Sequence, residues 1–158
     1  MNFLTEHGIG SYEELESRLT AVSARRDTAH TEIKRIENRA AELTLVMKHA
    51  GTYRQLKPLY DRYRKSNDKE KFLRGHESEI ILFEAAAREL KRLGAVPLPT
   101  TESMKTELAN LNAEKERLLA EYKAARTEAQ EYDTVKQNVD ALLAVPKEQE
   151  QQRRHELE

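Results

Sequence analysis

The chain of 158 residues contains no cysteine and no tryptophan, and only five glycines and four prolines. Without cysteine it forms no disulfide, no thiolate metal site and no cysteine nucleophile, which fits a reducing compartment, and we expect a cytoplasmic protein. Few turn-forming residues and 6% aromatic residues argue against a β-sandwich or barrel. No apolar run approaches the ~20 residues of a membrane span, so no membrane insertion is expected.

Charged residues make up 35% of the chain and hydrophobic residues 38%, with a net charge of −1. A chain that is rich in alanine, glutamate, lysine, leucine and arginine, with few helix breakers, is typical of long helices. Such helices bury a seam between them rather than a thick core. The net charge indicates no partner, and the distribution of charge along the chain is more informative.

Residues 11–50 form the first predicted helical arm. Ser11 and Glu14 have the spacing of a capping box, in which Glu14 reaches back to the Ser11 amide, and Gly51 is the predicted stop. Apolar residues recur with the alternating four- and three-residue spacing of a coiled coil, which only Arg26 interrupts. The predicted seam consists of Leu15, Leu19, Val22, Arg26, Ala29, Ile33, Ile36, Ala40, Leu43, Met47 and Ala50. Leu45, Val46, Leu119 and Leu142 are expected to be exposed beside the seams.

Residues 101–145 form the second predicted arm, which Thr100 or Thr101 caps and Pro146 ends. Its seam, with the same spacing, consists of Met104, Leu108, Leu111, Lys115, Leu118, Tyr122, Ala125, Ala129, Tyr132, Lys136, Val139 and Leu143. Residues 146–158 form a polar tail that is expected to fray. Its last dipeptide, Leu157-Glu158, is interpreted as vector-derived and Met1 as an added start, so a fragment of a longer protein is expected.

Two arms of matched length predict an all-α fold, a long antiparallel coiled-coil hairpin with a smaller helical tip between the arms. The residue numbers of facing partners then add to roughly 154. Arg26 would face Ala129 and Lys115 would face Ala40, so that each charged seam residue meets a small one and extends outward. We expect a monomeric hairpin or a weak dimer.

Residues 51–100 form the predicted tip. Residues 78–93 are the most apolar helix, which Gly94 ends, and Asp68 caps a shorter helix that runs through Arg74. Pro58 either starts or kinks a helix. Residues 51–75 carry eight basic and three acidic side chains. The basic residues are Arg54, Lys57, Arg62, Arg64, Lys65, Lys69, Lys71 and Arg74.

This basic segment also contains Tyr53, Tyr60 and Tyr63. Cations neutralise phosphates and tyrosine rings stack on bases, so the segment is a candidate for binding nucleic acid. The alternative is a solvated helical tip whose tyrosines pack inward on the apolar helix of residues 78–93. Both interpretations remain open from the sequence.

No catalytic residue, metal site or cofactor is predicted. The five histidines are far apart in the sequence, and the run from His76 resembles a zinc-protease helix but has Ile80 where the second histidine is needed. The chain has no glycine-rich phosphate loop and no nucleophile elbow. We therefore expect no enzyme activity from this chain.

Three runs carry a family resemblance: residues 51–63 (GTYRQLKPLYDRY), 68–80 (DKEKFLRGHESEI) and 91–100 (KRLGAVPLPT). They resemble the region downstream of the nuclease domain in relaxases, the mobilisation nucleases of conjugative and mobilisable elements of Firmicutes. The resemblance covers nearly the whole chain. Nothing here matches the histidine cluster or the catalytic tyrosine with which a relaxase nicks DNA.

The resemblance implies a non-catalytic accessory region of a DNA-nicking relaxase. Its implied partners are DNA, through the basic tip, and relaxosome proteins or the coupling protein of the secretion channel. The alternative is a structural coiled-coil spacer or dimerisation module that binds no DNA. An autonomous nuclease is the third and least favoured hypothesis.

Overall fold

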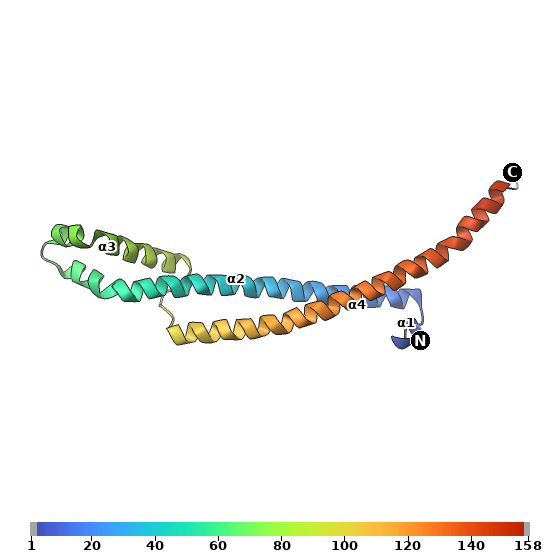
Figure 1. The fold of residues 1–158 in the computed structure, drawn as a ribbon, viewed down its shortest axis with the longest axis horizontal. Coiled ribbons are helices and arrows are strands. Elements are labelled where there is room, and N and C mark those ends of the chain that lie inside the picture. Colours follow the sequence, from blue (N-terminus) through green and yellow to red (C-terminus); the bar gives the residue numbers. More distant parts are fainter. Residues whose placement is uncertain (1–2, 157–158) are drawn as a thin grey trace. The chain divides into compact units, whose positions relative to one another are not determined.

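The computed structural model describes residues 3–156, and the side chains of residues 3–144, as four α-helices without a strand among them. The residues interpreted as vector-derived or added, Met1, Leu157 and Glu158, lie outside this part. The helices are α1 (Phe3–Glu6), α2 (Tyr12–Lys65), α3 (Lys69–Arg92) and α4 (Thr101–Glu156) (Figure 1). The predicted all-α hairpin is confirmed, because α2 and α4 pack against each other as its two arms.

The chain divides into two units. The first contains residues 1–33 and 116–158, and the second contains residues 34–115. Both long helices contribute to each unit, while α1 belongs to the first unit and α3 to the second. Within the described residues, no helix combines the length and the apolar character that crossing a membrane requires.

The helix starts follow local hydrogen bonds that the sequence predicts. The Glu14 amide donates to Ser11 Oγ at 3.1 Å, and the Ser103 amide donates to Thr100 Oγ1 at 3.1 Å. The return bond of the first cap differs from the prediction, because Glu14 Oε2 accepts from the Gly10 amide at 3.0 Å and not from the Ser11 amide. The Glu14 side chain thus reaches one residue further back than predicted, to Gly10, which has no side chain to obstruct it.

The prediction that Gly51 stops the first helix is wrong, since α2 continues through Gly51 and Pro58 to Lys65. Gly51 does not have the positive φ of a helix-ending glycine. Burial of Ala50 and the packing of Tyr53 extend the apolar face of α2 beyond this point. Such packing outweighs the cost of about 1 kcal/mol for glycine within a helix.

The prediction that Pro146 ends the last helix is also wrong, because α4 continues to Glu156. A proline removes one backbone hydrogen bond from a helix interior. The residues after it are mostly glutamate, glutamine, lysine and arginine, which have high helix propensity and favour resumption of the helix. The tail expected to fray is therefore helical in its backbone.

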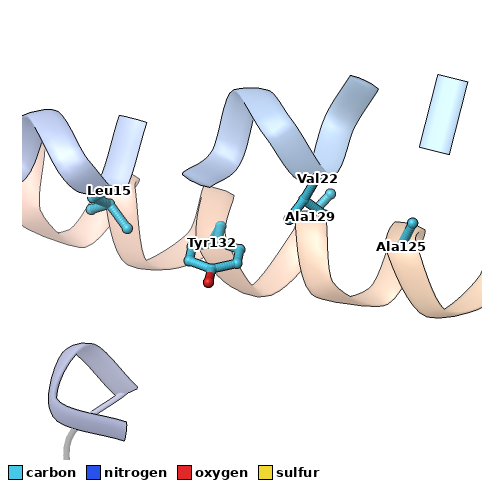
Figure 2. Packing of buried hydrophobic residues seen from close by; sticks show 5 residues of the cluster. All are labelled: Leu15, Val22, Ala125, Ala129 and Tyr132. Atoms are coloured by element: carbon cyan, nitrogen blue, oxygen red, sulfur yellow. The ribbon is translucent and has the colours of Figure 1, made fainter. Parts of the chain in front are cut away.

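The core of the first unit joins α2 to α4 through large residues set against small ones. Its buried members are Leu15 and Val22 from α2 and Ala125, Ala129 and Tyr132 from α4 (Figure 2). The two alanines occupy little space, whereas Tyr132 is the largest of the fully buried side chains. Phe3 of α1 packs on this cluster and meets the Tyr132 ring edge-on, with centroids 5.1 Å apart.

The antiparallel register in the first unit is set by polar pairs beside this core. Tyr12 Oη donates to Asp140 Oδ1 at 2.6 Å, and Lys136 Nζ lies 3.9 Å from Glu16 Oε1. The predicted register, in which facing residue numbers add to roughly 154, places Tyr12 opposite Leu142, two residues from its hydrogen-bond partner Asp140. A heptad pattern alone cannot fix the offset between two arms more closely.

The charged seam residues Arg26 and Lys115 each form an ion pair with a carboxylate. Arg26 Nε lies 3.1 Å from Asp27 Oδ1 on its own helix, so it does turn away from the seam. Lys115 Nζ, which was predicted to extend outward past Ala40, lies 3.5 Å from Glu37 Oε1 of the other arm. An ion pair at the edge of the seam thus accommodates the lysine.

In the second unit, α2 packs against α3 and against α4. Its buried apolar residues are Ile36, Leu43, Val46 and Ala50 of α2, Ile80, Phe83, Ala86 and Leu90 of α3, Ala95, and Met104 and Leu111 of α4. The prediction that Val46 is exposed is wrong, because a helix with two neighbours buries a wider face than a two-helix seam does. Leu45 is exposed, as predicted.

The helix α3 begins and ends as the sequence predicts, and the two helices predicted within it meet at a kink. Asp68 Oδ1 accepts from the Lys71 amide at 3.1 Å, and Gly94 adopts a φ of +69° just beyond the last turn. The predicted break between residues 74 and 78 is a kink at His76, where φ is −136° and ψ is 26°. Only one residue leaves helical geometry, so the helix resumes.

Candidate nucleic-acid interface

All eight basic residues predicted as a nucleic-acid site are exposed. Six of them flank the short turn between α2 and α3, at residues 66–68, and they are called the basic turn here. The basic turn consists of Arg62, Arg64, Lys65, Lys69, Lys71 and Arg74. Two acidic residues, Asp68 and Glu70, lie within the same stretch, so the positive charge dominates.

The other two predicted residues, Arg54 and Lys57, have structural partners. The Arg54 guanidinium donates to Thr101 Oγ1 at 2.8 Å and to the Pro99 carbonyl. It therefore ties α2 to the start of α4. Lys57 Nζ lies 3.1 Å from Asp61 Oδ2 one helical turn away, so its charge is already balanced.

The arginines at the two ends of the basic turn have weaker anchors. The Arg62 guanidinium carbon lies 5.9 Å from the centroid of the Phe72 ring, within cation–π range. Arg74 Nε donates to the Glu70 carbonyl at 3.4 Å. Both side chains are exposed and keep further N–H donors for a ligand.

The four remaining cations, Arg64, Lys65, Lys69 and Lys71, have no ion-pair partner among the residues with described side chains. Arg64 and Lys65 lie in the last turn of α2, where basic side chains complement the helix dipole. The favourable interaction with the helix dipole is sufficient to explain why Arg64 and Lys65 are basic. The dipole of α2 does not explain Lys69 and Lys71, which lie outside that helix.

Lys69 and Lys71 lie in the first turn of α3. The amino end of a helix is its positive end, so a lysine there is unfavourable by about 0.3–1 kcal/mol. Helix stability therefore does not account for these two charges. Together with the dipole of α3 they raise the positive potential of the turn, which favours an anionic ligand.

The three tyrosines of this segment pack inward on α3. Tyr53 and Tyr60 stack on the Phe83 ring with centroids 4.8 Å and 4.3 Å away. Tyr63 is tilted against Phe72 at 6.0 Å. All three tyrosines are half-buried. Tyr53 and Tyr60 pack on the helix of residues 78–93, as the alternative interpretation of the sequence describes, whereas Tyr63 packs outside that range. Their first role is therefore to hold α3 on α2.

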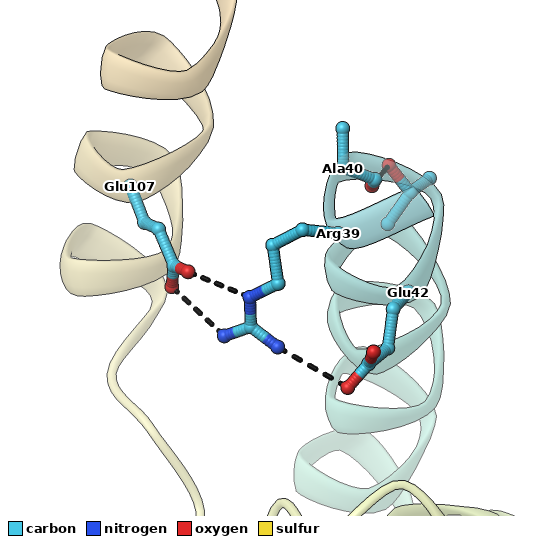
Figure 3. A network of polar contacts seen from close by, with 5 residues as sticks. Arg39, Ala40, Glu42 and Glu107 are labelled. Atoms are coloured by element: carbon cyan, nitrogen blue, oxygen red, sulfur yellow. Dashed lines mark hydrogen bonds and ion pairs between the residues drawn. The ribbon is translucent and has the colours of Figure 1, made fainter. Parts of the chain in front are cut away.

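A polar network that the sequence analysis did not identify joins the arms within the second unit. Arg39 Nε donates to Glu107 Oε1 at 2.7 Å and its Nη2 donates to Oε2 at 3.1 Å (Figure 3). A third bond reaches Glu42 Oε1 at 3.2 Å. The hydrogen bond to Glu107 is the main reason why the pKa of Arg39 is raised. Only the Arg39–Glu42 spacing was visible in the sequence.

The histidines take part in packing and surface pairing. His7 stacks on Phe3 with centroids 4.1 Å apart, and His76 Nδ1 lies 3.5 Å from Glu79 Oε2. In the part of the chain that the structure describes, no three histidine or carboxylate side chains converge to hold a metal ion. The charged groups that do gather form the basic turn.

Comparison with known proteins identifies no relative: no family model, no curated protein and no solved structure matches the chain. The resemblance to relaxases therefore stays a prediction from the sequence. The basic turn and the helices α2 and α3 that flank it are the features of the structure that bear on function.

Proposed function

We propose that this chain is a non-catalytic helical module that binds DNA phosphates through its basic turn. The observation that supports the proposal is the placement of four cations around one turn, two of them at the positive end of α3. None of the four has an ion-pair partner among the side chains that the structure describes. The relaxase context, in which the module would assist DNA mobilisation, rests on the resemblance of residues 51–63, 68–80 and 91–100.

The chemistry of the basic turn suits a phosphate backbone. Arg64 offers a planar fork of N–H donors, while Lys65, Lys69 and Lys71 offer mobile point charges. Binding to phosphates releases the counterions condensed on DNA, so the affinity should fall steeply with salt. Because phosphates carry no sequence information, the turn alone should bind all sequences similarly.

The second candidate function is a structural spacer or dimerisation module without DNA binding. The observation that favours it is the exposure of Leu142 and Leu143 on α4, which are 72% and 60% exposed. These leucines offer an apolar surface to a second copy or to a relaxosome protein. On this hypothesis the basic turn is only a solvated surface.

A charge-reversal experiment separates the two functions. The variant Arg64→Glu, Lys65→Glu, Lys69→Glu reverses three cations of the basic turn. The control Lys105→Glu, Lys123→Glu, Arg126→Glu changes the net charge equally at exposed positions of α4. Binding to a fluorescent duplex is measured by anisotropy at low salt.

We expect the basic-turn variant to lose at least tenfold in affinity, while the control stays within about threefold of the wild type. Circular dichroism of each variant establishes that the helices are retained. Equal affinities of the two variants, or no binding by the wild type, would contradict the proposal and favour the spacer.

A further inference from the structure

A shallow groove of about 420 Å³ lies between α2 and α3 beside the basic turn. Its aromatic lining comes from Tyr53, Tyr60 and Phe83: each tyrosine ring stacks on Phe83, which is buried between α2 and α3. Ala87 lies one helical turn beyond Phe83, and its small side chain leaves space on the α3 wall. The half-buried rings of Tyr53 and Tyr60 are therefore the aromatic surface that the groove offers to a ligand.

The rim of the groove is polar and carries more positive than negative charge. Arg64 and Arg88 lie on it, together with one unbalanced carboxylate, Glu84. The remaining pair, Lys57 and Asp61, is mutually neutralised at 3.1 Å. Arg64 belongs both to the groove and to the basic turn, so the two surfaces are continuous.

Two tyrosine hydroxyls in the lining, those of Tyr53 and Tyr60, have no hydrogen-bond partner among the residues whose side chains are described. A tyrosine hydroxyl both donates and accepts, and an arginine plane stacks on a ring. A ligand that fits these features has flat apolar faces, a polar edge and a nearby negative charge.

A nucleotide of a single DNA strand has this combination. We propose that the groove holds an unstacked nucleobase while Arg64 contacts its phosphate, so that the module prefers single-stranded DNA over duplex. In a duplex the bases are stacked and paired, and entering the groove would require unstacking. This inference rests on the proposed function, because the basic turn has to hold the backbone.

An abasic strand distinguishes the contribution of the bases to the affinity from that of the phosphates. Affinities are measured at one low salt concentration for a thymidine 12-mer, an abasic 12-mer of equal charge, and a duplex. Since stacking of a base on aromatic side chains is worth ~1–3 kcal/mol, the thymidine strand should bind at least about fivefold more tightly than the abasic strand. It should also bind more tightly than the duplex.

Two variants test the location. Ala87→Gln fills the groove with a good helix former, and Arg88→Gln removes one rim cation without changing the basic turn. In both variants the affinity for the thymidine strand should fall toward the affinity for the abasic strand. Ala87→Gln should bind the abasic strand as tightly as the wild type does. A wild type that binds both strands equally, or an Ala87→Gln variant that keeps the full difference, would overturn the inference.

The two proposals fail in different ways. Equal, salt-dependent binding of thymidine, abasic and duplex DNA would overturn the groove inference and leave the basic turn as a phosphate-binding surface. No binding of any of the three would overturn the proposed function together with the groove inference.

Discussion

Arg39 and Glu107 form a two-pronged pair across α2 and α4, with N–O distances of 2.7 Å and 3.1 Å. Both side chains are about 40% exposed, so solvent screens their attraction. A pair of this kind contributes about 0.5–1 kcal/mol at best. Its main effect is on the alignment of the two arms, because the planar fork of donors on Arg39 binds the Glu107 carboxylate in one orientation.

We predict that Arg39→Ala lowers the free energy of unfolding by about 0.5–1 kcal/mol at low salt. Arg39→Lys should recover little of it, since lysine cannot form the two-pronged bond. Urea denaturation at low and high salt measures both, and the loss should shrink at high salt. The matched control is Lys34→Ala, which removes only the pair with Glu37 on the same helix. An equal loss in the control would contradict this account.

A second prediction concerns pH and the bond from Tyr12 to Asp140. This hydrogen bond raises the pKa of Tyr12 above its ordinary value of about 10 in the folded chain. The bond therefore stabilises the fold fully below about pH 10, and the stabilisation is lost as rising pH ionises the phenol of the unfolded chain.

The variant Tyr12→Phe isolates this effect, because it keeps the ring and removes the donor. The wild type should be more stable than the variant at pH 8, and the difference should decrease between pH 9 and 11. Denaturation of both proteins across this range measures it. A difference that is constant with pH would mean that the bond does not form in solution.

A third prediction is that the two arms pair within one chain. The chain has no cysteine, so Arg18→Cys and Lys136→Cys introduce a unique pair of label sites. With helix axes about 8–10 Å apart, spin labels at these sites should lie within roughly 20 Å of each other. Dilution with unlabelled protein keeps the distance if it is intramolecular. Loss of the short distance on dilution would indicate arms exchanged between chains.

A fourth prediction is that the chain does not cleave DNA. The described residues provide no metal-ligand cluster, and no nucleophile with an adjacent base was found in the sequence. A supercoiled plasmid that carries a transfer origin should stay intact with Mg²⁺ or Mn²⁺. Nicking that copurifies with the protein through two different columns would contradict this.

The helix starts and the end of α3 could be predicted because they depend on neighbours in the sequence. Ser11, Asp68 and Thr100 each accept a hydrogen bond from the amide three residues later. Gly94 supplies the positive φ that ends α3. The heptad spacing predicted that the arms form a coiled coil, and their matched lengths on either side of the tip predicted the antiparallel pairing.

The features that depend on packing between distant segments could not be predicted. Gly51 continues α2 because α3 covers the helix beyond it, and Val46 is buried in the same unit. The sequence also gave no indication that Arg54 would donate to Thr101 instead of remaining free for a ligand. Each of these outcomes depends on the placement of α3 or on the register of the arms.

Contact between the basic turn and DNA phosphates should be visible in the salt dependence of the affinity. The logarithm of the affinity of the wild type for duplex DNA should fall linearly with the logarithm of the salt concentration, by roughly 0.9 per phosphate contact. Lys69→Gln, Lys71→Gln should reduce that slope by about 1–2, whereas Lys105→Gln, Lys123→Gln should leave it unchanged. Equal slopes for the wild type and both variants would show that the basic turn does not contact DNA.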